Sequence, residues 1–312
     1  MLDVLDVLDV LDDALDPTEV GKSYPLQTLT EVQYGQRDYM LMSIGGGTGS
    51  GKTLLAHEFA SHNWKEHGEK SLMVMLEEQN GKTVKNVCGK ADSVPYHLPD
   101  AEFDTSQLRA TATEMNDHIY LWASKVDQDR RFNMESILQA IRHFAVRDGI
   151  KNVFFDNVTA VTQHLSPTEI NTEVGNIAKR FAGLAEEFNL RIFCFSHLNP
   201  PSGGKSHEEG APVREREFTG SRALQRWSHI MGGFVRNKHE EKFFNLKLLD
   251  GSEVTVQGKN ISYFEILKDR EFGLTCKVHT CYIPETGRLL EYAENLGEVF
   301  NDEVDDEEGQ DF

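Results

Sequence analysis

Short apolar runs alternate with segments of helical character along the middle of the chain. The runs are too short for typical helices and predict strands buried on both faces; they occupy residues 39–45, 71–78, 152–158 and 190–198. The segments between them that we expect to be helical are residues 52–66, 134–148 and 172–188. Strands that alternate with helices in this way form a mostly parallel sheet covered by helices. We therefore predict an α/β fold.

The pattern changes after about residue 230. Strand-like segments then follow one another with tight turns between them, at residues 230–237, 243–256, 261–268 and 274–284. Asp250-Gly251 lies inside the second segment and is typical of a β-hairpin turn. We expect these strands to extend the same sheet, antiparallel at one side, rather than to form a separate domain.

The first residues repeat Leu-Asp-Val with a period of three. On a helix such a stripe drifts by about 60° per repeat, and Pro17 is expected to end it. The segment is either a surface helix or an arm that docks on a neighbouring subunit. We divide the chain into an acidic arm (residues 1–24), a core domain (25–292) and an acidic tail (293–312).

The charge of the chain is concentrated at its ends. The 312 residues carry a net charge of −19, but residues 1–20 hold seven acids and residues 289–312 hold ten, with no Lys or Arg in either segment. The remaining residues balance 34 acids against 32 bases. The acidic total therefore does not exclude nucleic-acid binding by the core domain.

Composition excludes several classes of protein. No apolar run approaches the about 20 residues that a membrane-spanning helix needs, and the first 17 residues lack the basic residues of a targeting segment. Cys88, Cys194, Cys276 and Cys281 include no CxxC pair, which argues against a zinc ribbon and a disulfide scaffold. We expect a protein of a reducing cytoplasm, which is that of a bacterial host if a phage encodes it.

A glycine-rich segment between the first predicted strand and helix fits the pattern GxxxxGK[ST]. Its residues are Gly46, Gly47, Thr48, Gly49, Ser50, Gly51, Lys52 and Thr53. Glycines let backbone N–H groups face phosphates, while the Lys supplies a cation and the Thr offers a hydroxyl to Mg²⁺. The alternative is a Gly-rich turn that only resembles the motif. The flanking strand and helix favour a phosphate-binding loop (P-loop).

Acidic residues and one His lie at the C-terminal ends of three of the predicted strands. Asp156 ends an apolar run, where a carboxylate that holds the metal is expected, and Glu77 and Glu78 are candidates for the base that activates water. His197 could sense the terminal phosphate by hydrogen bonding. The alternatives are capping or solvated acids and a structural His. Together these residues indicate nucleotide hydrolysis.

Several motifs resemble the helicase half of the T-odd phage primase-helicases and Twinkle, within the DnaB-like, RecA-fold hexameric helicases. The most specific is SHLNPPSGGKSHEEGAPV (196–213). It is supported by MLEE (75–78), FTGSRAL (218–224), VRNK (235–238), EILKDREFG (265–273) and YIPETGRL (282–289). The resemblance spans residues 25–290 and implies a RecA-like P-loop core in a ring, usually a hexamer, around single-stranded DNA.

The resemblance also implies roles for single residues. Lys52 and Thr53 bind phosphate and Mg²⁺, Asp156 holds the metal, Glu77 is the catalytic base, and His197 links the nucleotide, ATP or dTTP, to the following loop. Because the nucleotide lies between subunits in that family, the matching arginine acts on the neighbour's site.

Four further residues match the family's nucleotide contacts. Arg270 corresponds to the arginine finger, and Lys268 is a second candidate for that task. Arg236 and Tyr282 correspond to residues that sandwich the base, and a guanidinium plane and an aromatic ring are chemically suited to stacking. Without the resemblance, Arg270 would be interpreted as an ordinary strand-end ion pair.

The expected DNA loop follows His197. Its candidate contacts are Asn199, Ser202, Gly203, Gly204 and Lys205. Small residues permit close approach to phosphates, and backbone N–H groups with one Lys suit sequence-independent binding. The alternative is an ordinary Gly/Pro surface loop. A second central loop is expected at residues 162–172 and contains no Lys or Arg.

Two segments bear on partners. Only about 38 residues precede the first core strand, and they contain no paired cysteines, so we expect no primer synthesis by this chain and allow for a separate primase. The acidic tail ends at Phe312. It is either a solvated, disordered tail or, as the resemblance implies, a segment that docks on the replicative polymerase or competes with single-strand-binding protein.

The sequence as a whole favours a ring-forming DNA helicase that moves 5′→3′ by Mg-NTP hydrolysis. The alternatives are a recombinase of the RecA type, a helicase loader or other ATP-dependent switch, and a small-molecule P-loop kinase. Nothing in the sequence resembles the lid or acceptor site of a kinase.

Overall fold

The computed structural model describes residues 11, 15, 20–123, 133–201 and 203–293. The predictions on most of the N-terminal arm, on Ser202 and on the acidic tail from residue 294 fall outside these described residues. Among the described helices, none has the length and apolar character needed to cross a membrane.

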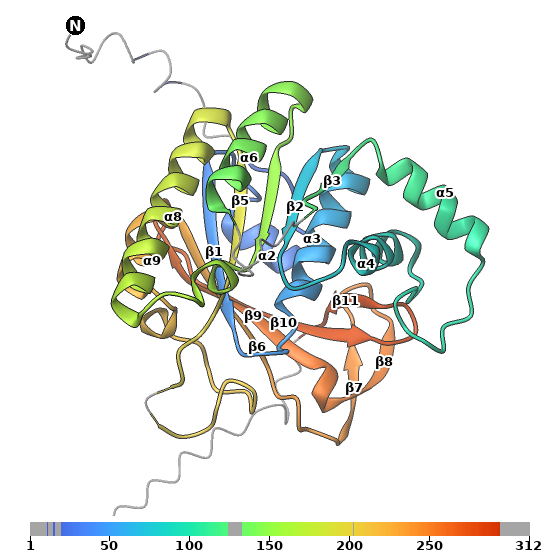
Figure 1. The fold of residues 1–312 in the computed structure, drawn as a ribbon. Helices are drawn as coiled ribbons and strands as arrows, with labels where there is room; N and C mark the ends of the chain where they lie inside the picture. Colours follow the sequence, from blue (N-terminus) through green and yellow to red (C-terminus); the bar gives the residue numbers. More distant parts are fainter. Residues whose placement is uncertain (1–10, 12–14, 16–19, 124–132, 202, 294–312) are drawn as a thin grey trace, which may run out of the picture.

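A nine-stranded sheet lies at the centre of the described chain (Figure 1). In spatial order its strands are β11 (Arg288–Glu291), β10 (Cys276–Ile283), β9 (Ile261–Asp269), β6 (Ile230–Arg236), β1 (Met40–Gly46), β5 (Arg191–His197), β4 (Asn152–Asp156), β2 (Ser71–Met75) and β3 (Ile119–Leu121). The strands from β6 to β3 pair in parallel, and β9, β10 and β11 continue the sheet in antiparallel fashion. Every residue of β1, β2 and β4 is buried. The predicted α/β fold with antiparallel C-terminal strands is confirmed.

Helices cover both faces of the sheet (Figure 1). One face packs against α6 (Met134–Asp148), α7 (Val158–Thr162), α8 (Pro167–Phe188) and α9 (Ser221–Trp227). The other packs against α2 (Gln27–Gln33), α3 (Lys52–His67), α4 (Asn80–Asp92) and α5 (Thr105–Met115). Each face therefore has its own apolar core, and the sheet separates the two.

Glycine and capping residues set the ends of the predicted helices. Helix α3 begins at Lys52, as expected, and ends at His67; the capping residue Gly68 follows, and its φ of +62° suits glycine. Helix α6 begins after Asn133, whose side chain accepts a hydrogen bond from the Ser136 N–H, and it ends at Asp148, before the capping residue Gly149 with φ +66°.

The expectation of a central loop at residues 162–172 is wrong. Residue 162 ends α7, and α8 already begins at Pro167, earlier than the predicted start at 172. Ser166 and Glu169 form a capping box, in which the Glu169 carboxylate accepts hydrogen bonds from the Ser166 N–H (2.9 Å) and hydroxyl (2.6 Å). Most of the segment is therefore the start of a helix.

The strands after residue 230 differ from the expectation in two ways. Strand β6 remains parallel to β1, because the chain crosses over through α9 before it enters the sheet. Strands β7 (Phe243–Lys247) and β8 (Glu253–Gln257) do not join the main sheet but form their own two-stranded sheet. The hairpin predicted at Asp250-Gly251 is present, with Gly251 at φ +87°. Only one face of this hairpin is buried, against a small cluster that includes Leu246 and Val256.

Candidate nucleotide site

The P-loop connects the central strand β1 to the N-terminus of α3. Gly49 and Gly51 have φ values of +69° and +112°, which glycine adopts without the strain a side chain would cause. A Cβ at Gly46 would lie 2.7 Å from the Phe234 carbonyl oxygen. The segment therefore needs its glycines, and the N-terminus of α3 supplies a favourable end for an anion.

Neighbouring parallel strands bring the predicted catalytic residues to one edge of the sheet. Strands β1, β5, β4 and β2 are adjacent, and their C-terminal ends lead to Gly46, His197, Asp156 and Glu77. Parallel strands end at the same edge, which is where open α/β sheets bind ligands.

Lys52 is buried beneath the P-loop. Its ammonium donates hydrogen bonds to the carbonyl oxygens of Gly46 (2.8 Å) and Gly47 (3.0 Å). Burial lowers the pKa of Lys52 to about 8, although the Asp156 and Glu77 carboxylates oppose the shift. A bound phosphate would stabilise the charged ammonium.

Thr53 and Asp156 form the pair expected of a magnesium site. The Thr53 hydroxyl donates to Asp156 Oδ2 over 2.6 Å, and Asp156 is buried at the end of β4. Burial raises the pKa of Asp156, although the Thr53 hydrogen bond opposes this shift. Mg²⁺ prefers oxygen ligands and usually binds with phosphates through one or two protein groups. This pair of oxygen ligands therefore fits Mg²⁺ that arrives with a nucleotide.

The structure separates the two candidate bases, Glu77 and Glu78. Glu77 Oε2 lies 3.5 Å from His197 Nε2, and this hydrogen bond lowers the pKa of Glu77. Glu78 instead turns toward α3 and α4, where it contacts His57 Nε2 (3.0 Å) and the Thr83 hydroxyl (2.9 Å). Burial tends to raise the pKa of Glu78, but these hydrogen bonds outweigh it and lower the pKa to about 2. Of these two glutamates, Glu77 is the one that lies on the side of the P-loop.

His197 connects Lys52 to Glu77. Its Nδ1 lies 3.5 Å from Lys52 Nζ, while Nε2 faces Glu77. An ammonium can only donate, so we assign Nδ1 as the acceptor and Nε2 as the N–H that donates to Glu77. The backbone N–H of His197 donates a hydrogen bond to the Thr159 hydroxyl over 3.1 Å, and this bond holds the end of strand β5 in place.

Asn157 is a site residue that the sequence analysis missed. Its Nδ2 lies 3.3 Å from His197 Nε2, and a hydrogen bond from the Asn157 side chain to the Glu77 carboxylate also helps lower the pKa of Glu77. The Asn157 Oδ1 accepts the Ala160 N–H, so the residue caps α7. The available signal in the sequence was its position directly after Asp156.

Arg270 and Lys268 lie at the other end of the sheet. Strand β9 is antiparallel to β6, so Phe264 pairs with Phe234 beside the P-loop, whereas Asp269 pairs with Ile230. Five residues of strand separate the two ends by roughly 17 Å. The structure therefore does not bring these cations to the P-loop of the same chain.

Both cations contact the end of α9 instead. The exposed Arg270 donates to the Arg226 carbonyl, and Lys268 donates to the Gln225 carbonyl. Burial lowers the pKa of Lys268, and the neighbouring Arg270 charge adds to the shift.

Arg236 and Tyr282 lie at the P-loop end of the sheet. Arg236 follows Phe234, which pairs with Gly46, and its guanidinium donates to the Lys259 carbonyl. Burial lowers the pKa of Arg236 and raises that of Tyr282, and each group opposes the other's shift, so the two lie within electrostatic range. The Tyr282 ring is half-buried and faces Lys90, whose Nζ is 5.6 Å from the ring centre.

The loop between β5 and α9 projects from the body of the domain (Figure 1). Its base is closed by the Asn199 N–H, which donates to the Glu217 carbonyl (2.7 Å), and by buried His207, 3.2 Å from the Asn199 carbonyl. Gly203, Gly204 and Lys205 are exposed at its tip. The described candidates for DNA contact thus lie on an exposed loop with a fixed base.

The same loop returns to the P-loop through Glu208. The Thr48 N–H donates to Glu208 Oε1 over 2.9 Å, and Lys238 Nζ donates to the Thr48 carbonyl over 2.7 Å. Neither Glu208 nor Lys238 is among the site residues predicted from the sequence.

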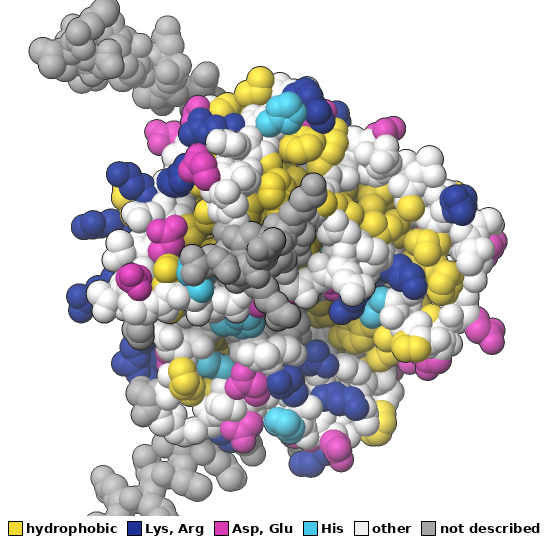
Figure 2. Space-filling model, in the orientation of Figure 1, with side chains coloured by type: hydrophobic (Ala, Val, Ile, Leu, Met, Phe, Trp, Pro, Cys, Tyr) yellow, Lys and Arg dark blue, Asp and Glu magenta, His cyan; other side chains and the backbone are white. Residues whose placement is uncertain are grey.

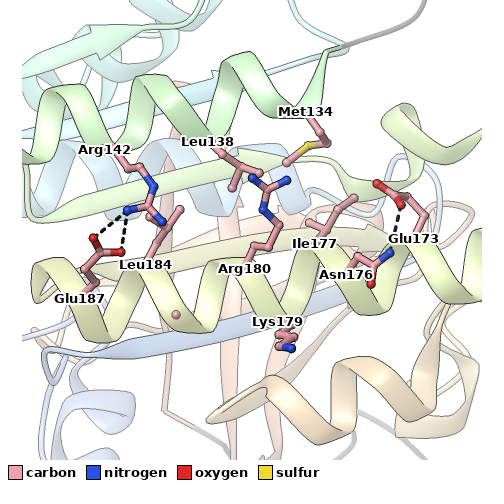
Figure 3. Close-up of a pocket in the computed structure, with 11 residues that line it drawn as sticks. Met134, Leu138, Arg142, Glu173, Asn176, Ile177, Lys179, Arg180, Leu184 and Glu187 are labelled. Atoms are coloured by element: carbon pink, nitrogen blue, oxygen red, sulfur yellow. Dashed lines mark hydrogen bonds and ion pairs between the residues drawn. The ribbon is translucent and has the colours of Figure 1, made fainter. Parts of the chain in front are cut away.

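A separate groove of about 510 Å³ lies between α6 and α8 (Figure 3). Its apolar floor is formed by Met134, Leu138, Ile177 and Leu184. Arg142 and Arg180 point into it and pair with Glu187 and Glu135, each over 2.7 Å. Lys and Arg side chains gather along the edge of the molecule that carries α8 and α9 (Figure 2).

The chain has relatives among known protein families and known proteins. A family described as "DnaB-like helicase C terminal domain" matches residues 21–213. The DNA helicase/primase of Enterobacteria phage T3 is 22% identical over 220 residues, 68% of this chain and 38% of that protein. The circadian clock protein KaiC2 of Synechocystis sp. is 28% identical over 127 residues, 41% of this chain and 20% of that protein. The chain thus spans about two fifths or less of these relatives' lengths.

Solved structures show the same fold. A DnaB-like replicative helicase, described together with its interactions with primase, superimposes with a TM-score of 0.68 at 17% identity, covering 93% of this chain and 68% of that one. A second solved structure, described as an ATPase domain, gives a TM-score of 0.65 at 17% identity and covers 91% of this chain and 95% of that one. The RecA-like core expected from the sequence is confirmed.

Proposed function

Because the chain belongs to the family of DnaB-like helicase C-terminal domains, we propose that it is a ring-forming motor that moves 5′→3′ along single-stranded DNA by hydrolysing Mg-NTP. The observation that carries the proposal is the meeting of Lys52, Thr53, Asp156, Glu77 and His197 at the ends of adjacent parallel strands. This set combines phosphate binding, metal binding and water activation.

Each group has a chemical task that its environment suits. The lowered pKa of Glu77 keeps the carboxylate ionised at neutral pH, as a base that accepts a proton from water must be. Thr53 and Asp156 would hold Mg²⁺, which, when bound, neutralises developing charge on the phosphates. His197, between Lys52 and Glu77, begins the DNA loop and can transmit changes at the nucleotide to it.

Hydrolysis in this proposal takes place between two subunits. Arg270, with Lys268 beside it, lies at the opposite end of the sheet from its own P-loop, so it would stabilise the transition state on a neighbour. Arg236 and Tyr282 would hold the base of ATP or dTTP. An arginine supplied in trans makes hydrolysis depend on closure of the interface.

The N-terminal arm is proposed to assemble the ring. Its Leu-Asp-Val repeats offer an apolar stripe flanked by acids. The groove between α6 and α8 on a neighbouring copy offers an apolar floor with Arg142 and Arg180 directed into it. The apolar stripe matches the apolar floor of the groove, and the acids of the arm would pair with the two arginines in place of Glu187 and Glu135.

Removal of residues 1–19 should convert rings to smaller species, because each subunit loses the contact between its arm and the groove of the neighbouring subunit. Arg180→Glu should weaken assembly in the same direction, whereas Arg147→Glu, an exposed α6 arginine outside the groove, should not. Light scattering gives the mass of each species. A truncated chain that assembles like the full one would exclude this role of the arm.

Lys205 is proposed to bind DNA phosphates at the tip of its loop. Lys205→Ala should weaken oligonucleotide binding and reduce the slope of log affinity against log salt by about 0.7 for each phosphate that the variant no longer neutralises. Lys242→Ala removes an exposed lysine outside this loop and should leave both the affinity and the salt slope unchanged. Fluorescence anisotropy at several salt concentrations measures this, and equal effects of the two variants would argue against a DNA role for the loop.

The acidic tail and external partners complete the proposal. Residues 293–312, ending at Phe312, would dock on basic surfaces of a replicative polymerase or compete with single-strand-binding protein, and a separate primase would supply primers. The charge of the tail supports such contacts.

Unwinding of forked DNA tests the function directly. We expect the chain to open forks that have a 5′ tail, best with both tails, and only with hydrolysable triphosphate. Forks with only a 3′ tail should stay closed. Filaments without unwinding would indicate a recombinase, and nucleotide binding without turnover would indicate a loader or switch.

A further inference from the structure

Glu208 places a negative charge at the phosphate-binding loop. Its Oε1 accepts the Thr48 N–H over 2.9 Å, and Thr48 stands in the P-loop between Gly47 and Gly49. Burial tends to raise the pKa of Glu208, but the Thr48 hydrogen bond and the Lys238 charge outweigh it and lower the pKa. A carboxylate with its charge retained thus lies where the backbone is shaped to receive phosphates.

The position of Glu208 depends on the DNA loop. Glu208 is three residues from Lys205, and its carbonyl accepts the Lys238 N–H over 3.2 Å. His207 packs so closely on the P-loop that a Cβ at Gly47 would lie 2.9 Å from the His207 Cβ. A change at the P-loop therefore reaches the tip of the loop through only a few residues.

We propose that Glu208 opposes nucleotide at the P-loop and thereby links nucleotide binding to the position of the DNA loop. The carboxylate and a phosphate carry the same sign of charge, and Glu208 occupies a backbone N–H of the P-loop, so nucleotide binding drives Glu208 away from Thr48. By thermodynamic reciprocity, a DNA strand that draws the loop outward relieves this repulsion and raises nucleotide affinity. The DNA half of this inference rests on the proposed function.

This link is separate from the one through His197. His197 contacts Lys52 and Glu77 beside the catalytic centre, whereas Glu208 contacts the rim of the P-loop at Thr48. Glu208 is therefore a positioning residue that sets nucleotide affinity, and it takes no part in the reaction.

Glu208→Gln tests the proposal, because Gln keeps the size of the side chain and an acceptor for the Thr48 N–H but removes the charge. The probe is a fluorescent non-hydrolysable ATP analogue, titrated into the full chain with and without an oligonucleotide. We expect Glu208→Gln to bind the analogue about five- to tenfold more tightly than the wild type without DNA. The factor by which the oligonucleotide raises the affinity for the analogue should be smaller in Glu208→Gln than in the wild type, by about the same five- to tenfold.

Glu209→Gln is the matched control. Glu209 is the adjacent carboxylate, but it accepts hydrogen bonds from Ser206 rather than from the P-loop, so its variant should bind like the wild type. Glu208→Ala, which removes the charge and the acceptor, should also tighten binding. Unchanged or weaker binding by the Glu208 variants, or equal tightening by Glu209→Gln, overturns the proposal. A wild-type chain that binds nucleotide but fails to unwind forks would instead overturn the proposed function.

Discussion

Replacing Glu77 with Gln is expected to lower triphosphate hydrolysis by about 10²–10⁴-fold, the usual contribution of a general base. Gln has the same size but cannot accept a proton from water, so nucleotide affinity should stay close to that of the wild type. Phosphate release under saturating nucleotide gives the rate, and titration with a fluorescent analogue gives the affinity.

Glu78→Gln is the matched control for this variant. Glu78 pairs with His57 away from the P-loop. Loss of the Glu78 charge should therefore lower the free energy of unfolding by about 1–3 kcal/mol, but turnover per folded molecule should not fall comparably. Chemical denaturation measures the first quantity. A large loss of turnover in Glu78→Gln, together with an active Glu77→Gln, would reverse the assignment.

Arg270→Ala is expected to lower hydrolysis by about 10³-fold or more, as removal of an arginine finger does. Nucleotide binding and ring assembly should persist, because Arg270 lies at the far end of the sheet from its own P-loop and is exposed. Turnover, nucleotide titration and light scattering measure the three properties.

Arg109→Ala removes an exposed arginine on α5 and should leave all three properties unchanged. If Arg270→Ala loses nucleotide binding or fails to assemble, Arg270 acts mainly through its contact with the Arg226 carbonyl at the end of α9, rather than on a neighbour's nucleotide. Arg270 would then be a structural residue.

The parts of the site that the sequence predicts are those encoded by local pattern. The P-loop is one contiguous segment, and Asp156 and His197 end apolar runs that become buried strands. Once the sheet is parallel, their meeting follows from topology. Arg270 needed the family resemblance, because its partner belongs to another chain in the proposal.

The parts that the sequence does not predict depend on contacts between distant segments. Glu77 and Glu78 are adjacent, and only His57 on α3 shows which of them turns away. Thr48 and Glu208 are 160 residues apart, and no periodicity connects them.

Helix α4 shows how packing overrides local preference. It contains Gly81 and Gly89, which disfavour helices, and it is not among the helices predicted from the sequence. A Cβ at Gly89 would lie 2.5 Å from the Val94 carbonyl oxygen. Packing therefore requires a glycine at this position, although glycine lowers the helix propensity of the segment. The separate sheet of β7 and β8 has a different cause. Their alternating burial is a local pattern, but the sheet that they join depends on contacts between distant segments.

A mixture of the two inactive variants gives the most direct test of hydrolysis between subunits. Glu77→Gln retains Arg270, and Arg270→Ala retains Glu77, so co-assembled rings contain interfaces at which both intact residues meet. If subunits mix at random and sites act independently, an equal mixture with oligonucleotide should regain about a quarter of the wild-type rate of hydrolysis. A mixture that remains as inactive as either variant alone, although light scattering shows co-assembled rings, would contradict the account.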